Sequence, residues 1–221
     1  MHRGVAFDLD GTLVDSIADI GHALNVAFAS ESLPTFDVEQ VRRWVGDGPD
    51  GTIRRALAHL AITDTDELLH ARLRAAYDRA ALAAPFDHGR LYPGIVDALT
   101  SLQNDRPLAV VTNKPTVLAR AVLEAAGILH FFRAVHGADR RELRKPEPVM
   151  LFAAARDLET PVAQLCMVGD SAADLGAAAR AGCSACFVEW GYGRAEWPAA
   201  TPASVPRATS ASALLKLLHR P

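Results

Sequence analysis

Three acids, a hydroxyl and an ammonium group stand where apolar segments of the chain end. Asp8 and Asp10 follow the first apolar segment, and Asp170 follows a later one. Thr112 closes another apolar segment, and Lys145 directly precedes a proline. Carboxylates that converge repel one another unless a cation lies between them, and their hard oxygen atoms suit Mg²⁺. Together with a lysine and a hydroxyl they fit phosphoryl transfer, in which one carboxylate serves as the nucleophile.

The spacing of the acids suggests how their roles divide. Asp10 lies two residues after Asp8, so it can protonate a leaving group and then activate water. Asp170 and Asp174 are four residues apart at the predicted start of a helix, where both face the same side. The N-terminus of a helix also favours a bound anion.

Short apolar segments between helical patterns predict the elements that position these side chains. The predicted strands cover 4–8, 108–111, 134–136, 165–168 and 184–188. The predicted helices between and after them cover 95–102, 116–126, 147–158, 171–181 and 211–219. The strands do not alternate polar with apolar residues, as expected for a parallel sheet covered on both faces. The pattern therefore predicts a doubly wound α/β fold, whose ligands bind beyond the carboxyl ends of the strands.

The stretch after the first strand has a different pattern. It contains helical patterns at 17–30, 50–60 and 66–83 and no convincing strand. We expect residues 1–14 and 90–221 to form the core, with residues 15–89 inserted as a separate helical domain.

Charge and hydropathy exclude several classes of partner. The 221 residues carry a formal net charge of −3, which gives no basic surplus for nucleic acid. No apolar run reaches the roughly 18 residues of a membrane span, and the N-terminus lacks the apolar segment of a signal peptide. Three cysteines do not suggest a disulfide framework. We expect a soluble cytoplasmic protein that binds neither nucleic acid nor membrane; the sequence does not indicate its oligomeric state.

Four segments, in order along the chain, resemble the four motifs of the haloacid dehalogenase-like hydrolases. They are 8–16 (DLDGTLVDS), 111–115 (VTNKP), 144–148 (RKPEP) and 169–174 (GDSAAD). The resemblance implies a Rossmann-like core in which Asp8 is a nucleophile that forms an aspartyl-phosphate. It implies that Asp10 is the general acid and base, and that Thr112 and Lys145 hold the phosphoryl oxygens. An acid two residues after the nucleophile favours a phosphatase over a dehalogenase.

The same resemblance implies a Mg²⁺ cofactor and a helical cap domain. The metal ligands would be Asp8, the backbone carbonyl of Asp10, and Asp170. Asp174 would hold the water shell of the metal or Lys145.

Four segments resemble the phosphoglycolate phosphatases within this family. They are 112–115 (TNKP), 181–183 (AGC), 191–193 (GYG) and 43–48 (RWVGDG), the last of which lies in the cap, where this family selects its substrate. The resemblance implies hydrolysis of 2-phosphoglycolate to glycolate and phosphate, with substrate contacts from Asn113, Arg43, Gly46 and Gly48. Ala172, Ala173 and Glu147 depart from the usual motifs and leave the substrate preference open.

Alternative interpretations stay open at this point. The substrate could be another small phosphorylated metabolite, such as a sugar phosphate or a nucleotide, or the chain could bind such a metabolite without catalysis. Taken alone, Thr112 fits a strand-end hydroxyl bonded to backbone, and Lys145 fits a solvated surface lysine. Arginines such as Arg43 on a helix are commonly part of a solvated face.

Overall fold

A six-stranded parallel sheet forms the centre of the computed structural model, which describes residues 2–62, 67–193 and 205–219. Its strands, in spatial order, are β5 (Ala134–Gly137), β4 (Leu108–Thr112), β1 (Gly4–Phe7), β6 (Leu165–Gly169), β7 (Ser184–Val188) and β8 (Arg207–Ala208). Every neighbouring pair is parallel. This sheet confirms the predicted α/β fold class.

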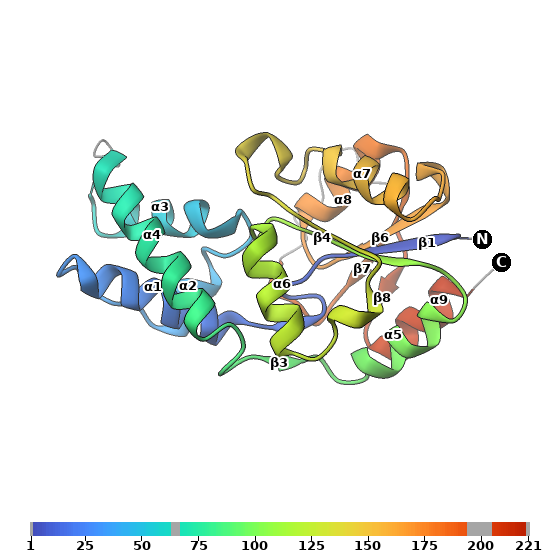
Figure 1. Ribbon diagram of the computed structural model, residues 1–221, viewed down its shortest axis with the longest axis horizontal. Helices are drawn as coiled ribbons and strands as arrows, with labels where there is room; N and C mark the ends of the chain where they lie inside the picture. Colours follow the sequence, from blue (N-terminus) through green and yellow to red (C-terminus); the bar gives the residue numbers. More distant parts are fainter. Residues whose placement is uncertain (1, 63–66, 194–204, 220–221) are drawn as a thin grey trace.

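Helices cover both faces of the sheet, which explains why its central strands are uniformly apolar (Figure 1). One face packs against α5 (Ile95–Gln103), α6 (Thr116–Ala125) and α9 (Ala211–Leu218). The other face packs against α7 (Val149–Asp157) and α8 (Ala172–Ala181). Short 3₁₀ helices lie at Leu129–Phe131, Arg141–Leu143 and Val162–Gln164.

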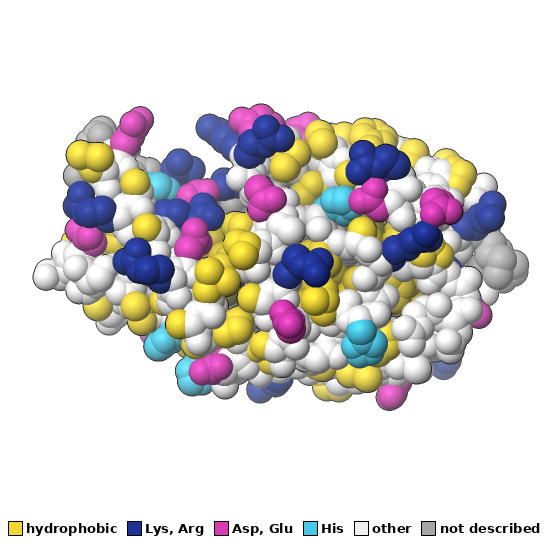
Figure 2. Space-filling model, viewed as in Figure 1, with side chains coloured by type: hydrophobic (Ala, Val, Ile, Leu, Met, Phe, Trp, Pro, Cys, Tyr) yellow, Lys and Arg dark blue, Asp and Glu magenta, His cyan; other side chains and the backbone are white. Residues whose placement is uncertain are grey.

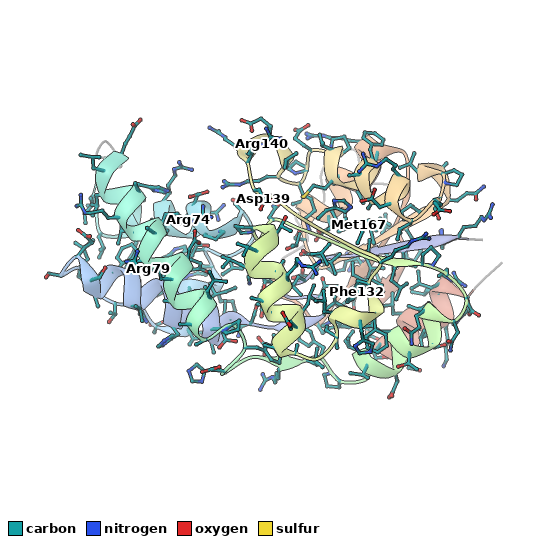
Figure 3. All side chains as sticks on the ribbon, viewed as in Figure 1. Arg74, Arg79, Phe132, Asp139, Arg140 and Met167 are labelled. Atoms are coloured by element: carbon teal, nitrogen blue, oxygen red, sulfur yellow. The ribbon has the colours of Figure 1, made fainter. Side chains whose placement is uncertain are left out.

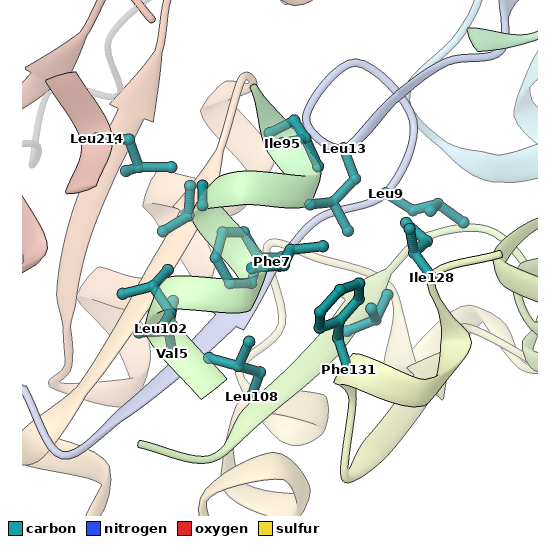
Figure 4. Packing of buried hydrophobic residues seen from close by; sticks show 14 of the residues in the cluster. Val5, Phe7, Leu9, Leu13, Ile95, Leu102, Leu108, Ile128, Phe131 and Leu214 are labelled. Carbon is teal, nitrogen blue, oxygen red and sulfur yellow. The ribbon is translucent and has the colours of Figure 1, made fainter. Parts of the chain in front are cut away.

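The alternation of side chains along β1 divides the core into two clusters. Val5 and Phe7 lie in the cluster beneath α5 and α9, shown in Figure 4, whereas Ala6 lies in the cluster beneath α7 and α8. Because both faces of β1 are buried, Asp8 at its end is held in a fixed position beside the neighbouring strands.

Four helices, which we call the helical unit, lie at one end of the sheet (Figure 1). They are α1 (Ile17–Ser30), α2 (Val38–Arg42), α3 (Gly48–His59) and α4 (Glu67–Ala83). They share a hydrophobic cluster of their own, to which α6 adds Leu118. The chain leaves through β2 (Val14–Asp15) and returns through β3 (Arg90–Leu91), and these two strands pair antiparallel.

The differences from the sequence-based prediction concern short elements. The prediction omitted α2, β2, β3 and β8, each of five residues or fewer, because so few residues carry no measurable periodicity. Of the predicted helix 66–83, residue 66 lies outside the described residues. No described helix combines the length and apolar composition that crossing a membrane requires.

Candidate active site

Strand order brings the predicted site residues together. The strands β4, β1 and β6 are adjacent in the sheet, and because they are parallel their carboxyl ends lie at one edge. Thr112 ends β4, Asp8 follows β1 and Asp170 follows β6. All three side chains are buried and line one pocket at this edge.

Lys145 joins two of the acids beneath this pocket. Its ammonium nitrogen lies 2.8 Å from Asp8 Oδ1 and 2.6 Å from Asp174 Oδ1. It also donates a hydrogen bond of 2.8 Å to the Val111 carbonyl oxygen. Burial opposes the charge of Lys145, but the carboxylates of Asp174 and Asp8 raise its pKa. Lys145 is therefore a buried structural cation, not a solvated surface lysine.

The start of α8 fixes Asp174. Ser171 is the N-cap of this helix, and its backbone N–H and hydroxyl donate to Asp174 Oδ2 at 3.0 and 2.6 Å. Asp174 Oδ1 is occupied by Lys145. Asp174 therefore ties Lys145 to the start of α8, which suits it to positioning the Lys145 ammonium group.

Asp170 is held by three donors. Thr12 Oγ1 donates to its Oδ1 at 3.2 Å, and the backbone N–H groups of Tyr192 and Gly193 donate to its Oδ2 at 2.7 and 2.9 Å. The backbone of Gly193 lies so close to the chain after β6 that a Cβ on Gly193 would be 2.9 Å from Ser171 Cα. The loop after β7 thus fixes the direction of the Asp170 carboxylate.

Three carboxylates form a cluster that can accept a divalent cation. One oxygen each of Asp8, Asp170 and Asp174 lies within 4.8 Å of the others, and all three residues are buried. Burial, together with the charges of Asp174 and Asp170, raises the pKa of Asp8 to about 7 against the opposing effect of Lys145. Burial and the charge of Asp174 raise the pKa of Asp170 to about 6. Because their pKa values are raised, these carboxyl groups are stabilised at neutral pH either by a bound proton or by a cation that lies between them.

Asp10 faces a different partner, Lys114, which the sequence-based prediction did not include among the site residues. The Lys114 ammonium nitrogen lies 2.7 and 2.9 Å from the two carboxylate oxygens of Asp10. Ser16 Oγ also donates to Asp10 Oδ1, at 2.5 Å. Lys114 lies in the turn directly after β4, two residues beyond Thr112, and this place in the sequence could have indicated that Lys114 belongs to the site.

Tyr192 is a second residue whose role the sequence did not reveal. Its hydroxyl accepts hydrogen bonds from the backbone N–H groups of Ser16 and Ile17 at 2.6 and 3.1 Å. It donates to Asp15 Oδ1 at 2.9 Å. Tyr192 therefore links the loop that holds Asp170 to the start of α1.

The loop between α2 and α3 and the first residues of α3 line one side of the pocket. Asn113 Nδ2 donates to the Gly46 carbonyl oxygen at 3.0 Å, and its Oδ1 accepts from the Lys145 N–H at 2.8 Å. Gly48 has a φ of +73°, and a Cβ there would lie 2.5 Å from the Asn113 carbonyl oxygen. The pocket encloses about 80 Å³, and the empty space is about 660 Å³ when the solvent at its open side is included.

An ion-pair network also connects the helical unit to the core. Asp50 on α3 contacts Arg144, the residue before Lys145, and Arg74 Nη1 lies 2.8 Å from Asp50 Oδ1. His70 Nε2 lies 3.2 Å from the same oxygen. Figure 3 shows Arg74 on α4, and in Figure 2 acidic and basic side chains gather where the outline is indented between the helical unit and the core.

Arg43 does not reach the pocket, unlike the other predicted substrate contacts. Gly46, Gly48 and Asn113 line the pocket, but Arg43 is exposed at the C-cap of α2. Val41 and Trp44 take the inward positions of this turn, and Arg43, which precedes Trp44, faces outward. The departure at Glu147 also lies away from the pocket, where Glu147 pairs with Arg180 at 2.7 Å on the surface.

Comparisons with known proteins agree with this geometry. The sequence matches the model of the haloacid dehalogenase-like hydrolases over residues 2–182. It is 35% identical over 195 residues to a phosphoglycolate phosphatase from Yersinia pseudotuberculosis, covering 88% of this chain and 84% of that protein. It is 38% identical over 196 residues to one from Vibrio cholerae, covering 87% of this chain and 86% of that protein.

The fold has solved counterparts too. A crystal structure described as a predicted phosphoglycolate phosphatase from Haemophilus somnus matches with a TM-score of 0.87 and 30% identity. The match covers 98% of this chain and 97% of that one. With the family match across most of its length, the chain belongs to the haloacid dehalogenase-like hydrolases and is a phosphoric monoester hydrolase.

Proposed function

We propose that this protein is a Mg²⁺-dependent phosphatase that hydrolyses 2-phosphoglycolate to glycolate and phosphate through an aspartyl-phosphate on Asp8. The observation that carries the proposal is the position of Asp8: its carboxylate lies in the pocket, 2.8 Å from the Lys145 ammonium and beside Asp170. A carboxylate beside a cation and a metal site suits nucleophilic attack on phosphorus. The names of the relatives support the choice of substrate.

The proposed reaction consists of two displacements at phosphorus. An Asp8 oxygen forms a bond to phosphorus while the ester bond breaks, and Asp10 gives its proton to the leaving oxygen. Asp10 then takes a proton from water, whose oxygen attacks phosphorus and breaks the bond to Asp8. Thr112 and Lys145 hold the phosphoryl oxygens in both steps. The ion pair of Lys145 with Asp174 keeps the ammonium group beside Asp8.

The metal site would consist of the Asp8 and Asp170 carboxylates and the Asp10 backbone carbonyl. The cluster of buried acids fits a hard divalent cation, and Asp170 is already oriented by Thr12 and the loop at Tyr192. When bound, Mg²⁺ would neutralise charge on the phosphoryl group and on the acids.

Residues 15–89 would act as a cap domain over a core of residues 1–14 and 90–221. Two features support this division: the helical unit has its own hydrophobic cluster, and its Gly46 and Gly48 lie at the pocket. A cap that covers the site excludes water and limits the size of the leaving group.

The substrate is tested by a panel of phosphate esters with Mg²⁺ in excess. The panel would contain 2-phosphoglycolate, a sugar phosphate, a nucleoside monophosphate and an activated aryl phosphate, each measured as kcat/KM for phosphate release. We expect 2-phosphoglycolate to exceed the sugar phosphate and the nucleotide at least tenfold. A higher value for either of those would assign another phosphate ester. Tight binding of 2-phosphoglycolate without phosphate release would indicate a non-catalytic binding protein.

A further inference from the structure

Two lysines line the pocket among the described residues, and they lie at different places in it. Lys145 is at the floor, between Asp8 and Asp174. Lys114 lies against Asp10, and its side chain is 7% exposed. The chain has one other lysine, Lys216, which is exposed on α9.

The helical unit adds no charge to this pocket within the described part of the chain. It contributes the uncharged residues Ile20, Val45, Pro49, Thr52 and Tyr77 together with two glycines. A negatively charged group in this pocket, away from the phosphoryl site, therefore has Lys114 as its available cationic partner among the described residues.

Lys114 has hydrogen-bonding capacity that Asp10 does not exhaust. An ammonium group has three N–H donors, and in the described structure the hydrogen bonds of the Lys114 ammonium group go to the two oxygens of the single Asp10 carboxylate. Asp10 has an additional partner in Ser16 Oγ, at 2.5 Å. Asp10 can thus keep the Ser16 contact if another carboxylate takes its place at Lys114.

We propose that Lys114 selects phosphate esters whose leaving group carries a carboxylate, an inference that rests on the proposed hydrolysis of 2-phosphoglycolate. In this substrate a single methylene group separates the carboxylate from the ester oxygen that Asp10 would protonate. A cation in contact with Asp10 is therefore within reach of that carboxylate. The substrate carboxylate replaces Asp10 as the partner of the Lys114 ammonium group, and Asp10 becomes free to contact the ester oxygen. An uncharged leaving group leaves Asp10 held by Lys114.

The test compares two substrates of the same shape. One is 2-phosphoglycolate, and the other is its carboxamide, phosphoglycolamide, whose leaving group has no charge. Phosphate release would be measured as kcat/KM for wild type, Lys114→Met and Lys114→Arg, with Lys216→Met as the matched control. Circular dichroism and thermal unfolding would verify the fold of each variant.

The quantity that decides is the ratio of kcat/KM for the carboxylate to that for the carboxamide. We expect a ratio of about ten or more in wild type and in Lys216→Met, and a ratio at least tenfold lower in Lys114→Met. Lys114→Arg keeps the charge and should keep most of the ratio. Any general damage to Asp10 lowers both rates together and leaves the ratio unchanged.

Two outcomes overturn the inference in distinguishable ways. If wild type hydrolyses 2-phosphoglycolate but Lys114→Met retains the wild-type ratio, the role of Lys114 is wrong and the proposed function stands. If wild type hydrolyses neither compound, the proposed substrate fails, and the role of Lys114 fails with it. The inference stays testable if Lys114→Met does not fold, because the ratio can still be measured for wild type and for Lys114→Arg. A wild-type ratio near one would overturn the inference.

Discussion

Lys145 and Asp174 form an ion pair inside the protein, with 2.6 Å between the ammonium nitrogen and Asp174 Oδ1. The two side chains are 2% and 0% exposed. Since the same ammonium lies 2.8 Å from Asp8 Oδ1, one buried cation holds two buried carboxylates in a fixed geometry. Removal of one partner of such a pair leaves a buried charge without compensation.

Asp174→Asn should therefore weaken both the fold and catalysis. We expect a loss of about 3–5 kcal/mol in the free energy of unfolding, measured by urea denaturation. We also expect kcat/KM to fall about 10–100-fold, because Lys145 loses the partner that aims it at Asp8. Asp97→Asn, an exposed acid on α5, is the matched control and should change neither quantity. Wild-type values for Asp174→Asn would show that the ion pair does not position Lys145.

Asp8→Asn should abolish turnover while the protein stays folded. An amide does not attack phosphorus, so kcat should fall by about 10⁴-fold or more, measured as phosphate release from 2-phosphoglycolate. The substitution preserves the shape of a buried side chain, and Asp174 still pairs with Lys145. Turnover at the wild-type rate in a verified variant would exclude Asp8 as the nucleophile.

Asp10→Asn should affect substrates according to their leaving groups. An alkyl phosphate needs a proton on its leaving oxygen, whereas an activated aryl phosphate leaves without one. The first displacement should therefore slow far more for alkyl esters, about 10²–10⁴-fold, as pre-steady-state phosphate transfer would measure. Equal losses for both kinds of ester would contradict the role of Asp10 as general acid.

The acid cluster should couple metal binding, stability and pH. Burial raises the pKa of Asp8 to about 7 and that of Asp170 to about 6, above the ordinary value of 3.8. The folded metal-free protein therefore holds more protons than the unfolded chain, and it loses stability as the pH rises from about 4 to about 7. A bound cation offsets this loss.

Thermal unfolding with and without Mg²⁺ measures this coupling. We expect Mg²⁺ to raise Tm more at pH 7.5 than at pH 5, where protons compete for the same carboxylates. Asp170→Asn should lose most of the Mg²⁺-dependent rise in Tm. An equal rise at both pH values would contradict the assignment of these acids to the metal site.

Asp50→Asn should weaken the connection between the helical unit and the core. Burial acts against the charge of Asp50, but hydrogen bonds and charges from Arg74, His70 and Arg144 lower its pKa to about 2. This stabilisation is present above about pH 4 and is lost as the pH falls through 2. We expect Asp50→Asn to lower the free energy of unfolding at pH 7 by about 2 kcal/mol, measured by urea denaturation.

The matched control for Asp50 is Asp78→Asn. Asp78 also pairs with Arg74, at 2.9 Å, but both residues belong to α4, so this pair does not cross to the core. Asp78→Asn should lower the free energy of unfolding by no more than about 0.5 kcal/mol. Equal losses for the two variants would argue against a connection through Asp50 and Arg144.

The sequence by itself determined the fold class and the family. Uniformly apolar strands such as Leu108–Thr112 occur where helices cover both faces of a sheet, so local composition was sufficient to predict them. The carboxyl ends of parallel strands share one edge, which predicted that Asp8, Thr112 and Asp170 would meet. Elements as short as β8 and α2 stayed hidden, because two to five residues carry no periodic signal.

Only the tertiary structure decided which partner each side chain has. Lys114 is next to Asn113 in the chain, yet its ammonium group reaches Asp10, 104 residues away, because β4 and β1 are adjacent. Arg43 follows a helix near the pocket but faces outward, because Val41 and Trp44 take the inward positions. Local sequence fixes the face of an element on which a residue lies. The relative placement of distant elements, set by packing across the whole core, determines what that residue contacts.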